Sequence, residues 1–357
     1  MRLLTILVII LALGWTGYWF VGAQALESAI RSAINEAREG GIEVDTASLE
    51  VAGFPNRLDT MIEQPQVHFP SSGITWSAPF LQILALSYRP NQVIIALPDT
   101  QELTGPFGAA AIDTDRARAS ATFSPSPSLP LDHANLVVED LLISSAGRDL
   151  SAKRLLAATR IPEGAEDGRV QNIGITLDDV KLPDTLARQL GGAATIDGAN
   201  LNATLTLDRP IDRDTYQGGE VRIEAINIET LDIDWGDVGL DASGDLQVGA
   251  DGYLAGELSV ALNNWPRALE LAAGAERIPQ DEASQARQGL SLLSGLSGAG
   301  NRIEVPLSFR DGVFSWGQSL WDQHPGSRRT VLGSNVPPGH GRDRTGSNER
   351  CRPRFGP

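Results

Sequence analysis

The sequence predicts an α+β protein rich in β-structure, in which an N-terminal transmembrane helix precedes an exported body of mostly antiparallel sheet with a few helices. Three observations lead to this prediction. An uncharged apolar run lies near the start, apolar and polar residues alternate through much of the rest, and short connections rich in glycine separate the segments. Helical patterns occur mainly next to the apolar run and after residue 263.

Length, charge and cysteine content exclude several classes of protein. The 357 residues suffice for one large or two ordinary domains. The formal net charge of −16 argues against a nucleic-acid partner, because binding to phosphates needs clustered Lys and Arg. A single cysteine excludes an internal disulfide framework and a multi-cysteine metal site, and four scattered histidines argue against a histidine-rich one.

The apolar run Leu3–Val21 predicts a membrane anchor. Its 19 uncharged residues, at about 1.5 Å each, nearly span the ~30 Å hydrocarbon core of a bilayer. Arg2 precedes the run and Glu27 is the first charge after it, so the N-terminus is expected to be cytoplasmic and the body exported. Aromatic residues that suit a membrane–water boundary lie at the exit end: Trp15, Tyr18, Trp19 and Phe20.

A cleaved signal peptide is the alternative interpretation of residues 1–22. Ala23-Gln24-Ala25 fits a small-residue cleavage site, but the apolar run exceeds the usual ~7–15 residues of a signal core. We therefore expect an uncleaved single-pass protein of the inner membrane, which contacts the bilayer through residues 3–21. Residues 23–40 predict an amphipathic helix, either a stalk or a docking helix, which ends at Gly40-Gly41.

The segment 41–317 predicts the β-rich body. Strand patterns occur at 42–44 and 49–51, and the segments 80–86 and 93–97 flank an Arg89-Pro90-Asn91 turn in a predicted hairpin. The rings of Phe54 and Tyr88, each close to a turn, are expected to pack over hairpin ends and to be structural.

A stretch rich in Pro and Ser at 124–130 is either a loop or a domain joint. Further strands are expected at 134–138, 173–177, 203–207, 221–228 and, separated by glycines, between 231 and 258. Helices are expected from Trp265, with Asn264 as the cap, and over 279–293, and a last strand over 303–309.

No sequence signature of catalysis occurs, so we predict no catalytic, cofactor-binding or metal-binding residue and no enzymatic activity. Six aspartates lie close together in sequence and could hold Ca²⁺, but without EF-hand spacing they favour a solvated surface: Asp232, Asp234, Asp237, Asp241, Asp245 and Asp251. A second charged cluster at 208–214 favours solvated pairs over a buried network. His68 and His133 are interpreted as surface or satisfied residues, and Trp76, Trp235, Trp265 and Trp316 as core residues rather than ligand platforms.

The chain resembles the DUF2125 family of uncharacterised, membrane-anchored bacterial proteins. The likeness covers nearly all of residues 1 to 316 and rests on the segments 17–20, 53–59, 76–80, 87–91, 241–245 and 264–265. The family has no established activity, so the resemblance implies no catalytic residue. The segment 242–258 is more distantly similar to AsmA-like envelope proteins, which implies a long exported sheet and a role in envelope lipid homeostasis.

Residues 318–357 are predicted to be a disordered, frameshifted tail. They carry seven Arg against three acids, the only Cys and two of the four His, without hydrophobic periodicity. Related chains end with a sequence similar to SLGPIPLGPAPRL. Ser315–Pro325 can be encoded by a set of codons that, after insertion of a single T behind the first codon, is translated in the new frame as SLGPIPLGPAP. We therefore expect a one-base deletion near Ser315–Trp316.

These observations predict a non-enzymatic protein of the bacterial inner membrane, whose exported body contacts lipid or an envelope protein. The alternative is an exported scaffold module that binds protein or glycan through strand edges and aromatic residues. An envelope hydrolase ranks third. A continuous apolar face several strands long would favour lipid, whereas a flat polar sheet with a small aromatic patch would favour a partner.

Overall fold

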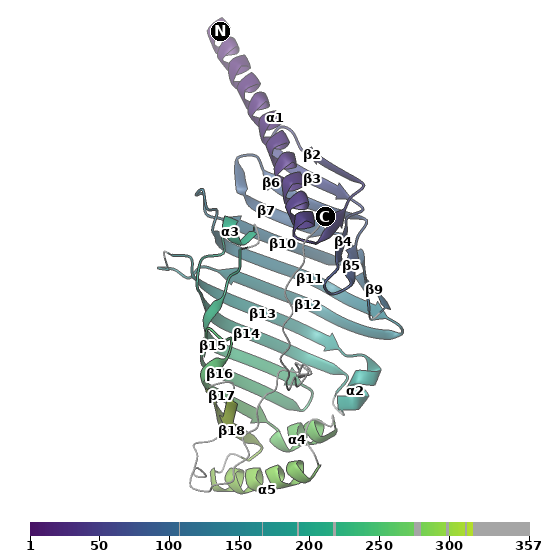
Figure 1. Cartoon of the computed structure of the whole chain (residues 1–357), viewed down its shortest axis with the longest axis vertical. Helices are drawn as coiled ribbons and strands as arrows, with labels where there is room; N and C mark the ends of the chain where they lie inside the picture. The colour runs from purple at the N-terminus through teal and green to yellow at the C-terminus, as the bar shows by residue number, and fades with distance from the viewer. Residues whose placement is uncertain are drawn as a thin grey trace, which may run out of the picture.

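A computed structural model describes residues 1–106, 108–165, 167–190, 193–216, 219–274, 280–297, 300–310 and 313–316. Within these residues the chain forms five helices and nineteen strands, and all strands belong to one antiparallel sheet (Figure 1). The predicted fold class is confirmed, because the structure is mostly antiparallel sheet with a few helices and begins with an apolar helix long enough to cross a membrane. The predicted tail at 318–357 lies outside the described residues.

The helices are α1 (Arg2–Glu39), α2 (Asp184–Leu190), α3 (Arg213–Tyr216), α4 (Trp265–Gly274) and α5 (Gln280–Ser297). The first ten strands are β1 (Glu43–Asp45), β2 (Ser48–Ala52), β3 (Arg57–Glu63), β4 (Gln66–Phe69), β5 (Ile74–Ser77), β6 (Phe80–Leu86), β7 (Arg89–Leu97), β8 (Thr100–Gly105), β9 (Gly108–Asp113) and β10 (Arg116–Phe123). The others are β11 (Leu131–Ser145), β12 (Arg148–Arg160), β13 (Val170–Lys181), β14 (Thr195–Leu207), β15 (Ile223–Trp235), β16 (Val238–Val248), β17 (Leu254–Asn263), β18 (Arg302–Arg310) and β19 (Val313–Trp316).

The long strand β11 joins two arms of the sheet. Its first part pairs with β10 and so with the arm β10–β7–β6–β3–β2, while residues 142–144 pair with β9 and so with the arm β9–β8–β5–β4–β1. From β11 to β19 each strand pairs with the next in sequence, as a meander. The sheet extends from α1 at one end to α4 and α5 at the other (Figure 1).

Helix α1 runs without interruption from the apolar run through the amphipathic segment and docks on the sheet. Trp19 and Ala23 are buried in a cluster with Leu58 of β3. Farther along the helix, the Arg31 guanidinium donates to the Leu49 carbonyl at 3.2 Å, and Arg38 Nε donates to the Val44 carbonyl at 2.9 Å. These bonds occupy backbone acceptors of the short N-terminal strands β1 and β2, which end the two arms.

The predicted hairpin at 80–97 forms, but its turn is displaced. Leu86 pairs with Arg89, so the turn is Ser87-Tyr88, and the Arg89-Pro90-Asn91 segment begins β7. The register shifts between Ala85 and Leu86, and this irregularity accommodates a proline that has no N–H for the ladder. The stretch 124–130 is a loop between β10 and β11, which are adjacent strands of the same sheet.

The helix predicted from Trp265 forms, but the predicted side-chain cap is wrong. Asn264 adopts a φ of 57°, its carbonyl accepts the N–H of Arg267, and its side-chain amide donates to the Asp237 carbonyl at 3.1 Å. The amide therefore fixes the turn between β15 and β16. Helix α4 contacts α2, α5 and β16, and its Trp265 and Leu271 are buried.

Candidate functional site

One face of the sheet is apolar across ten successive strands, from β7 through β10 to β18. Cross-strand partners lie on the same face, as do residues two apart in a strand. The register aligns a first row of side chains: Ile95, Ala119, Leu136, Ala157, Ile175, Leu201, Leu231, Ala242, Val260 and Val305. A second row lies beside it: Leu97, Ala117, Val138, Leu155, Leu177, Ala199, Ile233, Leu240, Leu262 and Ile303. We call these two rows the apolar face.

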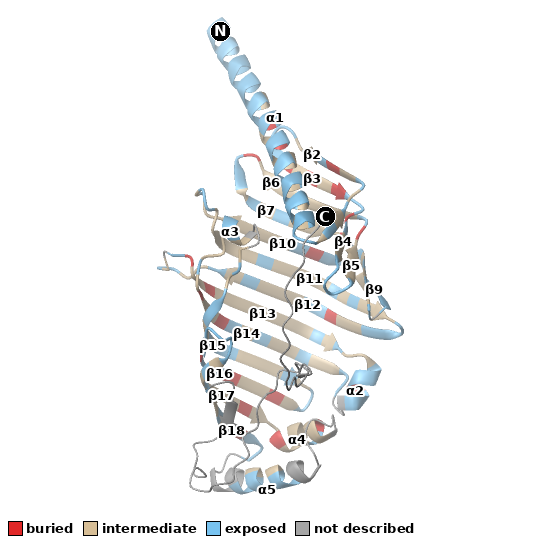
Figure 2. Cartoon of the chain, viewed as in Figure 1, coloured by how far each residue is buried: buried red, intermediate tan, exposed pale blue. Residues whose placement is uncertain are grey.

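The side chains of the apolar face are not fully covered by the described residues. All except Ala117, Ala242 and Ile303 are only half-buried, and most of the sheet in Figure 2 has the colour of intermediate burial. In a two-layer domain such a face is buried under a second sheet or helices. Here the face keeps apolar surface open to solvent, which is the property expected of a surface that receives another apolar molecule.

Helix α1 covers the continuation of this face in the β2–β3–β6 arm. Leu58 and Ala85 are cross-strand partners, and Ala85 continues through Val93, Ala121 and Ala134 on the same side as the apolar face. Leu58 and Ala85 belong to the cluster formed around Trp19 and Ala23. The apolar face is therefore continuous with the helix that is long enough to cross a membrane.

The opposite face of the sheet is polar. Asn202 donates to the Thr230 hydroxyl at 3.0 Å, and the Thr204 hydroxyl donates to the Asn172 side-chain carbonyl at 3.0 Å. A shallow cavity of about 900 Å³ on this face is lined mainly by polar groups, among them those of His133, Arg160, Asn172, Asn202 and Glu229. We call this side the polar face.

A line of interruptions in the strand pairing crosses four strands and gathers charge on the polar face. Between β11 and β12 the pairing stops after Glu139–Arg154 and resumes in the same register at Leu141–Ala152, so Asp140 and Lys153 are not paired in the ladder. The same interruption leaves Asp179 and Asp197 without ladder pairs in β13 and β14. Asp140 and Asp179 each have a φ of 49° there, and consecutive residues such as Glu139 and Asp140 line the same cavity.

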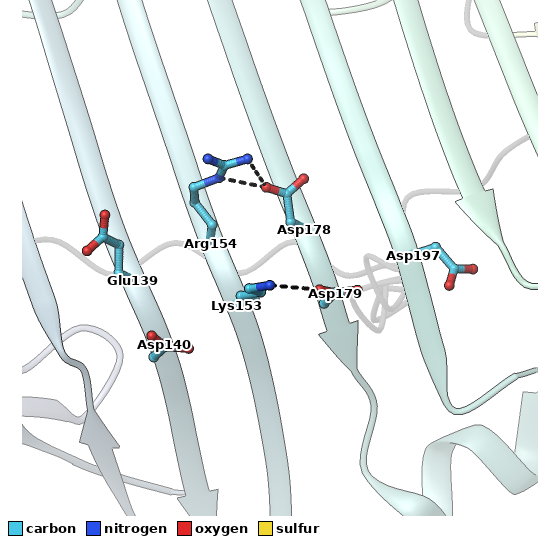
Figure 3. Close-up of a pocket in the computed structure, with 7 residues that line it drawn as sticks. All are labelled: Glu139, Asp140, Lys153, Arg154, Asp178, Asp179 and Asp197. Atoms are coloured by element: carbon cyan, nitrogen blue, oxygen red, sulfur yellow. Dashed lines mark hydrogen bonds and ion pairs between the residues drawn. The ribbon is translucent and has the colours of Figure 1, made fainter.

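Residues at this interruption line a charged cavity of about 510 Å³: Glu139, Asp140, Lys153, Arg154, Asp178, Asp179 and Asp197 (Figure 3). Arg154 pairs with Asp178 at 2.6 Å and Lys153 with Asp179 at 4.0 Å. Arg116 pairs with Glu139 at 3.1 Å, so the row Arg116–Glu139–Arg154–Asp178 alternates in sign across the strands. Its partly exposed pairs are compatible with a solvated surface.

Comparison with protein families identifies the chain. The profile of a family described as "Uncharacterized protein conserved in bacteria (DUF2125)" matches residues 19–318. The chain belongs to the DUF2125 family. Comparisons with curated proteins and with solved structures gave no match. The more distant similarity to AsmA-like proteins stays a prediction.

In this DUF2125 protein the predicted aspartate cluster is assembled only in part, because Asp232 and Asp241 are cross-strand partners on β15 and β16. Asp241 pairs with Arg302 at 2.6 Å, Asp245 accepts from Asn227 at 2.6 Å, and Asp251 accepts the N–H of Tyr253 at 3.2 Å. Within the described part of the chain, no group of three or more His, Cys, Asp or Glu has the arrangement of a metal site.

In the 208–214 cluster, Asp208 accepts the backbone N–H of Arg222 at 2.9 Å. This bond, aided by the charges of Arg209 and Arg222, holds the pKa of the Asp208 carboxyl below its ordinary value.

Both histidines singled out by sequence have intramolecular hydrogen-bond partners, as do Trp76 and Trp235. His68 bonds to the Thr75 hydroxyl and His133 to Asp132, each at 2.8 Å. Trp265 is buried, as predicted. Trp76 and Trp235 are half-buried and donate to the Gln101 side chain and to the Ala193 carbonyl. The side chain of Trp316 lies outside the described residues.

The junction between α1 and the sheet was missed by the sequence interpretation. Trp15 Nε1 donates to the Pro55 carbonyl at 2.8 Å, the Tyr18 hydroxyl to the Ser87 carbonyl at 2.8 Å, and Trp19 Nε1 to the Arg57 carbonyl at 2.6 Å. Three of the four aromatic residues at the exit end therefore bind two body loops.

The prediction that Phe54 and Tyr88 pack over hairpin ends needs correction. Phe54 is 50% exposed and contacts Trp19 and Phe20 of the helix, and Tyr88 is 58% exposed.

Proposed function

We propose that this DUF2125 protein is a non-enzymatic component of the bacterial cell envelope that binds lipid acyl chains on its exported sheet. Helix α1 anchors it in the inner membrane with the N-terminus in the cytoplasm, and the sheet lies in the periplasm. The observation that carries the proposal is the apolar face, two aligned rows across ten strands that remain half-buried.

The dimensions of the apolar face suit extended chains better than a compact ligand. Ten strands at about 4.8 Å each give rows on the order of 40 Å long. A hydrocarbon chain needs only continuous apolar surface, because it has no polar atoms to pair. The polar residues of the sheet are segregated on the polar face, which fits a role in which one side contacts water and the other contacts lipid.

The docking of α1 supports a retained anchor over a cleaved signal peptide. Trp19 and Ala23 are buried against Leu58. Cleavage after Ala25 would remove both residues and expose Leu58. It would also remove three hydrogen bonds from the helix to the body loops. The positive charge of Arg2 directly before the run favours a cytoplasmic N-terminus.

The scaffold alternative receives less support from the same features. Binding through strand edges needs free backbone groups, and α1 arginines occupy carbonyls of β1 and β2. Binding through aromatic platforms needs exposed rings on the sheet, and there Trp76 and Trp235 are half-buried, with their indole N–H groups bonded within the chain. We therefore favour lipid as the ligand.

Photocrosslinking from adjacent residues of β14 tests the proposal. Leu201 lies on the apolar face and Asn202 on the polar face of the same strand. A photoreactive benzophenone amino acid at position 201 of the full-length protein, irradiated in cells, is expected to yield adducts with phospholipid. The same group at position 202 is the matched control and is expected to give few.

Mass spectrometry of the adducts decides between outcomes. Phospholipid on position 201 and not on 202 supports the proposal. Equal lipid labelling at both positions, or protein adducts alone at position 201, would contradict it.

A further inference from the structure

We propose that the loops 53–57 and 87–89 of the body insert into the headgroup region of the outer leaflet of the membrane that α1 spans. The inference rests on the proposed membrane anchor and goes beyond it, because it assigns a membrane-binding surface to the body itself. Exposed aromatic rings from the helix and both loops form this surface: Phe20, Phe54 and Tyr88.

Hydrogen bonds fix the loops to the exit end of the membrane helix. The carbonyls of Pro55 and Arg57 accept from Trp15 and Trp19, and the Ser87 carbonyl accepts from Tyr18. The two loops are also joined to each other, because the N–H of Ser87 donates to the Asn56 carbonyl at 3.0 Å. The loops and this part of the helix therefore move as one unit.

The position of these donors within the apolar run sets the depth of the loops. Trp19 lies two residues before the end of the Leu3–Val21 run, and Trp15 lies six residues before it. At about 1.5 Å per residue these positions are roughly 3 and 9 Å inside the end of the run. A helix that places the run across the hydrocarbon core thus draws the hydrogen-bonded loops to its outer boundary, where the hydrocarbon meets the lipid headgroups.

The chemistry of the exposed rings matches that environment. Phe20 is 60% exposed, Phe54 is 50% exposed and Tyr88 is 58% exposed, in a part of the molecule where α1 already meets lipid. Phe54 and Phe20 stack with ring centroids 6.1 Å apart, so helix and loop present one apolar patch. Tyrosine is enriched at membrane interfaces because its ring is apolar and its hydroxyl can remain hydrated.

This placement also changes the role of the indoles in the anchor. The indole N–H groups of Trp15 and Trp19 donate to the body and are not free to bind lipid headgroups. The exposed rings of Phe20, Phe54 and Tyr88 therefore make the interfacial contacts expected of an aromatic belt. The body is then seated directly on the bilayer without a stalk between them.

Depth measurement by spin labelling tests the inference in the full-length protein. Nitroxide labels are attached at Tyr88→Cys or Phe54→Cys in a Cys351→Ser background. The protein is reconstituted in nanodiscs of phosphatidylethanolamine and phosphatidylglycerol. The readout is the accessibility of each label to oxygen, which concentrates in lipid, relative to a water-soluble nickel chelate.

Two further sites serve as controls. Tyr253→Cys is the aqueous control, because Tyr253 is a similarly exposed tyrosine, 53%, in the turn between β16 and β17. That turn is on the order of 30 Å from the β6–β7 turn at about 4.8 Å per strand. Leu11→Cys, in the middle of the apolar run, is the membrane control.

Four outcomes are distinguishable. The inference is supported if oxygen reaches the label several-fold more readily than the chelate does at position 11 and at position 88 or 54, and if the chelate reaches it more readily at position 253. Preferential access of oxygen at position 11, with preferential access of the chelate at positions 88 and 54, overturns the inference and leaves the proposed membrane anchor intact. An aqueous value at 11 overturns both. Lipid values at all positions, including 253, would show non-specific contact of the body and overturn the inference.

Discussion

Trp19 is the residue on which the attachment of α1 to the sheet depends most. Its ring is 5% exposed, its indole donates to the Arg57 carbonyl, and it contacts Phe54 edge-on at 5.5 Å. We expect Trp19→Ala to lower the free energy of unfolding by about 3–5 kcal/mol, because it removes a buried aromatic ring. Chemical denaturation in detergent micelles measures the change.

Tyr253→Ala is the control for this prediction, since that ring is half exposed and lies far from the helix. Phe54→Ala and Tyr88→Ala are expected to cost less than Trp19→Ala in micelles, because both rings are largely exposed. A loss at Tyr88 equal to that at Trp19 would contradict the exposure described for this loop.

The Asp208 carboxylate links stability to pH. Its pKa is lowered from 3.8 chiefly because the Arg222 N–H donates to the charged form. A group with a lowered pKa stabilises the folded state above its unfolded pKa, and this contribution disappears as pH falls through the folded value. The melting temperature of the wild type is expected to exceed that of Asp208→Asn at neutral pH, and the two are expected to converge in acid.

A matched titration of Glu270→Gln provides the comparison for Asp208. The pKa of Glu270 is also lowered, because the side chains of Arg267 and Arg287 donate to its carboxylate. Its variant should show a similar convergence in acid. A difference between wild type and Asp208→Asn that does not change between neutral and acidic pH would refute the linkage.

At the level of the elements, the interruptions in the pairing of β11 and β13 depend on backbone that tolerates positive φ. Asp140 and Asp179 both have a φ of 49°, which costs a β-branched residue about 1–2 kcal/mol. Asp140→Val should therefore be less stable than Asp140→Gly by about that amount, although both variants remove the same charge. Thermal denaturation of the two variants measures the difference, and equal stability would mean that the positive φ at residue 140 is not required.

The pairing of β16 with β17 depends on a close approach of their backbones at Gly256. This glycine has a φ of 141°, and a Cβ there would overlap the Asp245 carbonyl oxygen of the neighbouring strand. Gly256→Ala is expected to destabilise the sheet. Gly289→Ala in α5 is the control, because nothing lies within 4 Å of its Cβ position and alanine favours helix by roughly 0.5–1 kcal/mol. Opposite shifts in melting temperature are therefore expected.

The elements that could be predicted from sequence are those with clean alternation. Leu231, Ile233 and Trp235 alternate with aspartates, and this pattern predicted the end of β15. Strand β12 was missed because Lys153-Arg154 interrupts its alternation with two consecutive charges. Two consecutive charged residues also occur as Glu139-Asp140 and Asp178-Asp179, and such doublets are the sequence signal of the interrupted pairing.

The apolar face itself could be predicted strand by strand but not as a surface. Which side chains align depends on pairing between residues far apart in sequence, such as Val260 and Val305 across α4 and α5. The hydrogen bonds of Trp15, Tyr18 and Trp19 have no local signal either, because their acceptors are backbone carbonyls 38 to 69 residues away. Hydropathy therefore predicted aromatic residues at a membrane boundary but not their hydrogen bonds to the body.

For the whole molecule, the frame of the gene beyond Ser315 remains a prediction that resequencing tests. The family match extends to residue 318, and the predicted one-base deletion lies near Ser315–Trp316. We expect the neighbouring frame of the codons for Ser315–Pro325 to encode an ending similar to SLGPIPLGPAP. Codons that cannot produce it in either neighbouring frame would exclude the deletion.

The meander from β11 to β19 has a consequence for how the protein is assembled. Each strand pairs with its predecessor in sequence, so each new strand finds its template already formed, and loop closure costs little entropy. Under the proposed export and anchoring, the chain can thus fold in the order in which it is translocated. The apolar rows then lengthen by one residue each with every strand added. Gain or loss of a hairpin at the end far from α1 changes the length of the rows without changing the contacts between α1 and the sheet.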